Sequence, residues 1–137
     1  MPFSFHVEGR TCLKTFWGRV TAAEIRECER RARPLDFDAI LSDFSRVTRL
    51  EFGTRDLNGL AHMYGLRRPR AIVATRPQVF SCARMFEWLM KRSMRRVEVE
   101  VFQDYETARA WLKAGHPPRA EGFMMLPADE VMRTAGA

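Results

Sequence analysis

The chain begins with alternating apolar and polar residues. In residues 3–8 every second side chain is Phe or Val and the others are polar, which predicts a strand with one buried face. Residues 11–18 are rich in residues that favour strands, and they follow a short turn at Gly9-Arg10. These two segments are therefore expected to pair as a hairpin.

Four later segments have the spacing of amphipathic helices. The first opens with a capping box from Thr21 to Glu24, in which side chains and backbone bond reciprocally, and it ends before Pro34. The other three are expected to begin at Thr54, at Pro77 and after Asp104. In each of them apolar residues recur at the spacing of one helix face, which is expected to face the core.

Three more strands are expected between these helices. Residues 37–43 contain a buried strand core at 39–41, and residues 46–52 are expected to be an irregular or short extended piece. Residues 71–74 are continuously apolar, as in a parallel strand covered on both faces. In residues 97–101 valine alternates with glutamate, which predicts a half-solvated strand near a sheet edge.

The resulting order is β-β-α-β-α-β-α-β-α. This alternation favours an α/β fold with a mixed, mostly parallel five-stranded sheet, about four helices and an antiparallel strand at the N-terminus. We expect one domain at residues 1–114, followed by a C-terminal tail at 115–137. The apolar residues 123–126 of the tail either dock on the domain or contact a partner subunit.

Length and composition narrow the class of protein. The chain has 137 residues, of which 46% are hydrophobic, enough for a sizeable core and too many for a disordered chain. It has no apolar run long enough for a membrane span, and its first residues do not predict a signal peptide, so a cytoplasmic protein is expected. Cys12, Cys28 and Cys82 are far apart and have no histidine at ligand spacing, so no disulfide framework, metal site or cofactor is expected.

Charge adds one feature, which we call the basic collar. The net charge is +6, and 20 of the 23 basic residues are arginine. Nine arginines end the first helix or follow the second and third, and the C-terminal ends of these helices are expected to share one pole of a βαβ sheet. They are Arg30, Arg31, Arg33, Arg67, Arg68, Arg70, Arg92, Arg95 and Arg96. They either complement helix dipoles or dock a phosphate-rich partner, and nucleic acid is disfavoured because interleaved aromatic residues are missing.

The opposite pole, where strands end and helices begin, is where open α/β sheets usually bind ligands. The candidate ligand-binding or partner-binding residues there are Asp43, Ser45, Thr54, Asp56, Thr75, Arg76, Gln78 and Arg84. Thr54 is a candidate phosphoacceptor or a simple N-cap, and Arg84 either pairs with a loop acid or holds a ligand anion. The chain lacks a Gly-rich phosphate loop, a GxSxG elbow and a local nucleophile–base pair, so no enzymatic activity is expected.

Several segments resemble one family in their order and spacing. They are LSDFSRVT at 41–48, AIVA at 71–74, FSCARMF at 80–86 and VFQDYETARAWL at 101–112. The first is similar to a segment of STAS domains. Together the segments resemble the SpoIIAA-like, STAS/SEC14-related group of small bacterial proteins over residues 3–114.

The resemblance implies the same order of elements. It leaves three alternative functions open. STAS domains are mostly non-enzymatic interaction modules, which implies a protein partner or a homodimer with contacts at the pole of the second and third helices. SEC14-related domains bind lipids, so the alternative is a small-ligand or lipid carrier with an apolar pocket between helices and sheet. A further alternative is an anionic partner, a nucleic acid or a membrane surface, on the basic collar.

One segment departs from the family pattern. The bacterial antagonist proteins of this group carry Asp-Ser-Ser/Thr-Gly at the loop entering the second helix, and a Ser or Thr there is phosphorylated. This chain has Glu51-Phe52-Gly53-Thr54 at the matching positions. The serines are gone and Thr54 falls one position late, which argues against a phosphorylation switch of that type.

Overall fold

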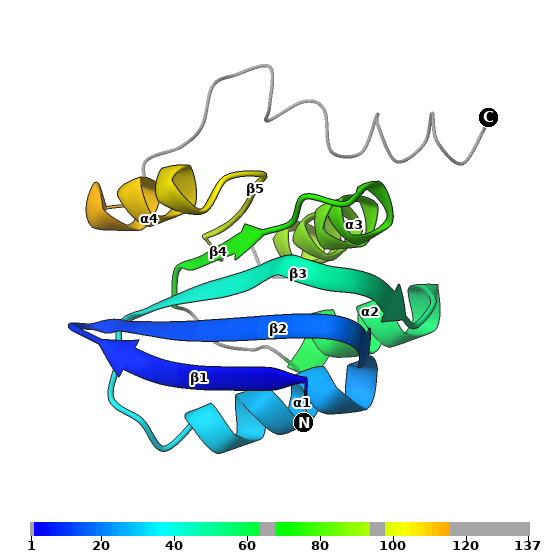
Figure 1. The fold of residues 1–137 in the computed structure, drawn as a ribbon, viewed down its shortest axis with the longest axis horizontal. Helices are drawn as coiled ribbons and strands as arrows, with labels where there is room; N and C mark the ends of the chain where they lie inside the picture. The colour runs from blue at the N-terminus through cyan, green and yellow to red at the C-terminus, as the bar shows by residue number, and fades with distance from the viewer. Residues whose placement is uncertain (1, 64–67, 94–97, 116–137) are drawn as a thin grey trace.

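A five-stranded sheet forms the centre of the fold, and its strands lie side by side in chain order (Figure 1). The computed structural model describes residues 2–63, 68–93 and 98–115. The strands are β1 (Phe3–Glu8), β2 (Thr11–Thr21), β3 (Ala39–Glu51), β4 (Arg70–Val73) and β5 (Val99–Phe102). β1 and β2 are antiparallel and the other neighbouring strands are parallel, which confirms the predicted fold class.

Among the described residues, helices cover both faces of the sheet, three on one side and one on the other. They are α1 (Ala22–Ala32), α2 (Thr54–Met63), α3 (Pro77–Ser93) and α4 (Tyr105–Lys113). The apolar stripes of the first three pack in one cluster with Phe16 and Ile72 of the sheet. Trp111 of α4 packs with Leu41 and Val73 from the opposite face. Successive right-handed crossovers between parallel neighbours place α1, α2 and α3 on the same side.

Strands β2 and β3 are longer than the sequence pattern indicates. β3 is one continuous strand, so the prediction of a strand at 37–43 and a separate irregular piece at 46–52 was wrong. It stays paired with β2 throughout, because register shifts at 15–17 and 18–19 absorb the irregularity. Gly18 lies at the second shift with φ +69°, a conformation that glycine adopts without strain.

The first helix begins as its sequence predicts. Thr21 ends β2 and is also the N-cap of α1, where its hydroxyl accepts from the N–H of Glu24 at 3.3 Å. The carboxylate of Glu24 accepts from the N–H of Thr21 at 2.8 Å, which completes the capping box. A strand and a helix therefore join without a loop, which fixes the direction in which α1 leaves the sheet.

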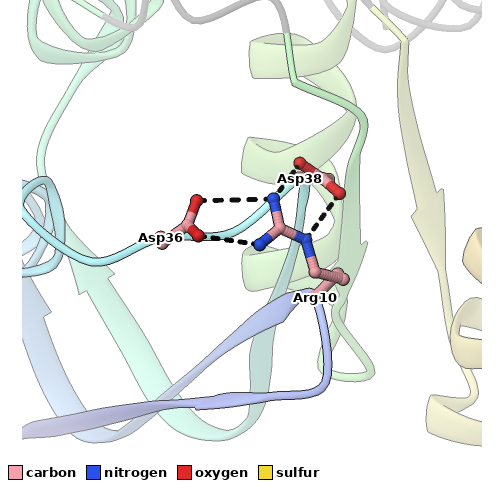
Figure 2. Close-up of polar contacts among 3 residues, drawn as sticks. All are labelled: Arg10, Asp36 and Asp38. Atoms are coloured by element: carbon pink, nitrogen blue, oxygen red, sulfur yellow. Dashed lines mark hydrogen bonds and ion pairs between the residues drawn. The ribbon is translucent and has the colours of Figure 1, made fainter.

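Arg10 joins the turn between β1 and β2 to the loop that precedes β3 (Figure 2). Its Nε and Nη2 donate to Asp38 at 2.8 and 2.7 Å, and its Nη1 donates to Asp36 at 2.8 Å. These hydrogen bonds favour the charged carboxylate and lower the pKa of Asp38. All three side chains are exposed, so the group positions the loop more than it stabilises the fold.

The last two strands differ in how well the sequence predicts them. β4 is buried along its whole length, as its continuous apolar run indicates. β5 lies at the sheet edge, as predicted, but it is buried and not half-solvated. Glu100 is only 7% exposed because α3 covers this edge and Lys91 contacts the carboxylate at 3.2 Å.

Gln78 replaces a missing strand partner of β3. β4 ends at Val73, opposite Asp43, so the outer part of β3 extends beyond it. There the side chain of Gln78 accepts from the N–H of Leu50 at 3.0 Å and donates to its carbonyl at 3.1 Å. One amide thus satisfies the backbone of a buried residue, as a neighbouring strand would.

We expect Gln78→Ala to lower the free energy of unfolding by about 1–3 kcal/mol, because it leaves both backbone groups of buried Leu50 without this partner. Urea unfolding monitored by circular dichroism measures the change. Gln103→Ala is the matched control, since Gln103 is exposed. Equal, small effects of the two substitutions would contradict the structural role of Gln78.

Candidate ligand-binding site

An apolar cavity of about 50 Å³ lies between the sheet and helices α1, α2 and α3. Ile25 of α1, Leu60 of α2 and Phe86 of α3 line it from the helical side, and Ile72 lines it from the sheet. The half-buried residues of the lining are Phe44, Phe52 and Cys82, and we call the side of the cavity that they border its mouth.

The amphipathic pattern of the helices builds these walls. Leu57 and Leu60 lie three residues apart on α2, and Val79, Ala83 and Phe86 follow one another at intervals of four and three residues on α3. Each set falls on one helix face, which is buried against the sheet. The predicted inner faces therefore supply the apolar lining of the cavity.

Four buried polar side chains line the cavity on the strand side and on α1. Lys14 of β2, Glu29 of α1, Ser42 of β3 and Arg70 of β4 are each at most 5% exposed. The ammonium group of Lys14 donates to the Glu29 carboxylate, and Nη2 of Arg70 donates to the same carboxylate at 3.1 Å. Nη1 of Arg70 lies 3.4 Å from the Ser42 hydroxyl. We call these four residues the buried charge cluster.

Burial and charge act in opposite directions on these groups. Burial lowers the pKa of Lys14, and the neighbouring charge of Arg70 lowers it further against the attraction of Glu29. Burial would raise the pKa of Glu29, but the charges and hydrogen bonds of Arg70 and Lys14 outweigh it and hold that pKa below its ordinary value. The carboxylate is therefore ionised at neutral pH.

The buried charge cluster was not predicted from the sequence. The alternation of the strands and the spacing of the first helix do, however, place its charged residues at inward positions. Lys14 lies between Cys12 and Phe16 on the inward face of its strand, and Arg70 is in phase with Ile72. Glu29 lies four residues after Ile25, on the inner face of α1. A charged residue at an inward position of two strands and one helix indicates a shared buried ion group.

The basic collar is only partly present as an exposed surface. The prediction was wrong for Arg70, whose side chain points into the core because the strand alternation places it beside Ile72. Arg30 and Arg31 pair with Glu27 of their own helix, while Arg68 and Arg92 lie over the rings of Phe37 and Trp88. Arg33 is exposed. The predicted positions Arg67, Arg95 and Arg96 lie outside the described residues.

The structure brings together three of the candidates at the opposite pole. The N–H of Ser45 donates to the Asp43 carboxylate at 2.9 Å, and Thr75 Oγ1 lies 3.5 Å from the Ser45 carbonyl. Asp43 and Ser45 lie within β3 and not in a loop after it, because the strand continues to Glu51. Gln78 is engaged by the β3 backbone, and Arg76 is exposed next to this group.

Thr54 and Asp56 lie at the start of α2. The carbonyl of Gly53 accepts from the N–H of Leu57 at 3.1 Å, so Gly53 is the N-cap and Thr54 is the first residue of the helix. The Asp56 carboxylate reaches back to the N–H of Gly53 at 3.2 Å. The N-cap interpretation of Thr54 was therefore one residue late. Its hydroxyl-bearing side chain is exposed.

Arg84 belongs to a second buried group, at the sheet edge. Glu87 is fully buried, and its carboxylate accepts from the N–H of Val101 in β5 at 3.2 Å. Nε of Arg84 lies 3.4 Å from this carboxylate and Nζ of Lys91 lies 3.7 Å from it. Burial raises the pKa of Glu87 to about 7, against the attraction of Lys91. Arg84 also borders a pocket of about 180 Å³ at the start of α4.

The cysteines have the chemistry of buried thiols. Burial raises the pKa of Cys28 to about 12 and also raises the pKa values of Cys12 and Cys82. A thiolate at Cys82, considered because the residue lies in the first turns of α3, is therefore disfavoured. Within residues 2–63, 68–93 and 98–115, no three His, Cys, Asp or Glu side chains gather as metal ligands. No helix in these ranges is long and apolar enough to cross a membrane.

Two solved structures illustrate what the chain is similar to. One is an uncharacterised protein of the DUF3478 family with a SpoIIAA-like fold from Shewanella loihica PV-4. It is 16% identical, the match covers 80% of this chain and 91% of that chain, and the TM-score is 0.53. Another is the anti-sigma factor antagonist SpoIIAA in its unphosphorylated form, with 12% identity, 82% and 98% coverage and a TM-score of 0.49.

No protein-family model matches the chain, and no curated protein matches its sequence. The likeness to the DUF3478 structure shows a SpoIIAA-like fold, as the resemblance in the sequence implies. At this level of identity it shows the fold alone, so function has to be argued from the site.

The raised pKa of Glu87 predicts that the stability of the fold depends on pH. Its pKa is raised in the folded state, so the folded chain binds this proton more tightly than the unfolded chain does. We therefore expect Glu87 to make the free energy of unfolding fall between about pH 4.5 and about pH 7. Glu87→Gln stays neutral and should remove this part of the fall. Relative to wild type, it should gain up to about 3 kcal/mol between about pH 5 and about pH 8.

Urea unfolding of wild type and variant at the two pH values measures this difference. Glu106→Gln is the control, because Glu106 is exposed on α4. A stability difference between wild type and Glu87→Gln that does not change with pH would contradict the raised pKa.

Proposed function

We propose that this chain, whose fold is SpoIIAA-like, is a non-catalytic domain that binds a small, partly apolar ligand between the sheet and helices α1 to α3. The observation that carries the proposal is the cavity, which combines apolar walls with the buried charge cluster. Ligand sites are usually concave and mostly apolar, with a few convergent polar groups that set orientation. This cavity has that composition.

The size of the cavity limits the ligand. At about 50 Å³ it is well below the roughly 150 Å³ of an apolar cavity that accepts benzene. It has room for a small group, with the remainder of a ligand lying at the mouth formed by Phe44, Phe52 and Cys82. A short or thin ligand fits this shape better than a complete membrane lipid. Of the small-ligand and lipid carriers considered from the sequence, the cavity therefore favours a carrier of a small ligand.

The site residues support binding over catalysis. The carboxylate of Glu29 is engaged by both Lys14 and Arg70, so it is a poor general base. Cys82 at the mouth has a raised pKa, which disfavours a nucleophilic thiolate. The polar groups of the site are thus suited to holding a ligand in one orientation.

A second candidate function is self-association through the uncovered part of the sheet. α4 packs mainly on β3, β4 and β5. It also contacts Leu13 of β2 and, through Arg109, Glu8 of β1, so the described helices leave the outer face of the hairpin uncovered near Trp17. Trp17 lies on this face with 39% of its surface exposed, and its register partner Arg46 is also exposed. Tryptophan and arginine are the residue types that contribute most to protein interfaces. This face fits a second copy of the chain.

Ala83→Phe tests the ligand-binding proposal. Ala83 is buried on α3 and lines the cavity, so a phenylalanine ring there fills the space that a ligand needs. We expect native mass spectrometry of wild-type protein from its own host to show a bound small molecule that Ala83→Phe loses. Ala110→Phe, on the exposed surface of α4, should retain it. Circular dichroism checks that both variants fold, and wild-type protein without any bound molecule would count against the proposal.

Trp17→Ser tests self-association. We expect the wild-type chain to be a dimer by light scattering and Trp17→Ser to shift it to the monomer, because the substitution removes the largest exposed apolar side chain of this face. Leu35→Ser is the matched control, since Leu35 is 37% exposed in the loop after α1. A monomeric wild type, or a dimer that Trp17→Ser leaves intact, would rule out this interface.

A further inference from the structure

We infer that the open edge of β1 pairs, in the antiparallel direction, with β1 of a second copy of the chain. The inference rests on the second candidate function above, self-association, and assigns the strand through which the copies join. β1 is the first strand of the sheet, and β2 is its one neighbour among the described strands (Figure 1). A strand at a sheet edge presents backbone N–H and C=O groups that a further strand can bind.

The register of the hairpin decides which backbone groups of β1 point out of the sheet. Hydrogen-bonded and non-hydrogen-bonded residue pairs alternate along two antiparallel strands. The N–H of Trp17 donates to the carbonyl of Pro2 at 3.1 Å, so these two residues are a hydrogen-bonded pair. Every second residue of β1 after Pro2 therefore bonds to β2. The residues between them, whose N–H and C=O groups point outward, are Phe3, Phe5 and Val7.

These outward groups are available to a second strand. Among the described residues, the hydrogen bonds made outside regular strand pairing include none to the backbone of residues 3–8. Residues 3–8 also contain no proline, lysine or register shift, which are common means of blocking an edge strand. The side chains of Phe5 and Val7 are half-buried, so a further strand would cover apolar surface as well.

β1 is complementary to itself when two copies run in opposite directions. With a twofold axis at Phe5, this residue pairs with its own copy, and Phe3 pairs with Val7 of the second copy. Each of these pairs exchanges two backbone hydrogen bonds, so all the outward groups of both strands find partners. On the outer face Glu8 falls beside Pro2 of the second copy, so the two Glu8 carboxylates do not oppose each other.

The surroundings of the edge fit the same partner. The guanidinium group of Arg31 lies 6.0 Å from the ring centroid of Phe3, so this side of α1 flanks the edge. Arg31 pairs with Glu27 at 3.0 Å, so the flank carries both signs of charge and two copies of this basic chain can approach each other there. The junction also includes Pro2, the hydrogen-bonded partner of Trp17, and is thus continuous with the exposed face around Trp17.

Amide hydrogen exchange of the full chain, followed by NMR at low and high protein concentration, tests this pairing. We expect the amides of Phe3, Phe5 and Val7 to exchange about tenfold more slowly once about nine-tenths of the chain is dimeric, because only the remaining monomer exposes them. The amides of Ser4 and His6 are the internal controls, since they are bound to β2 at both concentrations.

The outcomes separate the edge contact from self-association itself. A dimer by light scattering in which the three outward amides exchange as fast as in the dilute sample would overturn the edge contact and leave self-association standing. A chain that stays monomeric at every concentration would overturn both.

Val7→Pro gives the second test, because proline lacks the N–H that points outward at this position. Edge strands tolerate proline where that N–H faces away from the sheet, so β1 should keep its pairing with β2. We expect the Kd of the dimer to rise at least about tenfold, since both copies lose a hydrogen bond at the junction. Light scattering over a range of concentrations measures the change.

Val7→Ala is the matched control, because it shortens the same side chain and keeps the N–H. It should weaken the dimer much less than Val7→Pro does, and equal Kd values for the two variants would overturn the edge contact. Slow exchange of the Ser4 amide checks that the hairpin of Val7→Pro is formed. If that variant does not fold, the exchange experiment on the wild-type chain decides the assignment.

Discussion

The ion pairs of Glu29 are the interaction on which the helical side of this fold depends. One carboxylate of α1 binds Lys14 of β2 and Arg70 of β4, with β3 between these strands contributing Ser42. Such buried pairs add little net stability, but removing one partner leaves an unpaired charge in the interior and is strongly destabilising. The group therefore constrains where α1 can lie on the sheet more than it stabilises the fold.

That constraint also shapes the cavity. Lys14, Ser42 and Arg70 occupy inward positions on adjacent strands where an all-apolar chain would place core side chains. The long side chains of Lys14 and Arg70 converge on α1, and the apolar faces of α2 and α3 close over the remaining space. The cavity therefore has charged residues on its sheet side and on α1, because Lys14 and Arg70 occupy inward strand positions and Glu29 lies on the inner face of its helix.

The sheet carries a second buried ion group at its β5 edge, with a different role. There the Glu87 carboxylate accepts from the N–H of Val101, so a side chain of α3 binds the backbone of the edge strand β5. Gln78 does the same for Leu50 beyond the end of β4. Both residues come from α3, which therefore completes the sheet as well as covering it.

The order of elements, the two-sided cover of β4 and the inner helix faces could be predicted from the sequence, because these depend on local periodicity and caps such as Thr21 with Glu24. The sequence did not reveal that Lys14, Glu29 and Arg70 meet, since their contacts span up to 41 residues and depend on strand order. For the same reason Arg70 was misplaced on an exposed collar. Only tertiary packing decided which charges are buried, and hence where a ligand site can form, because burial is a property of neighbouring elements.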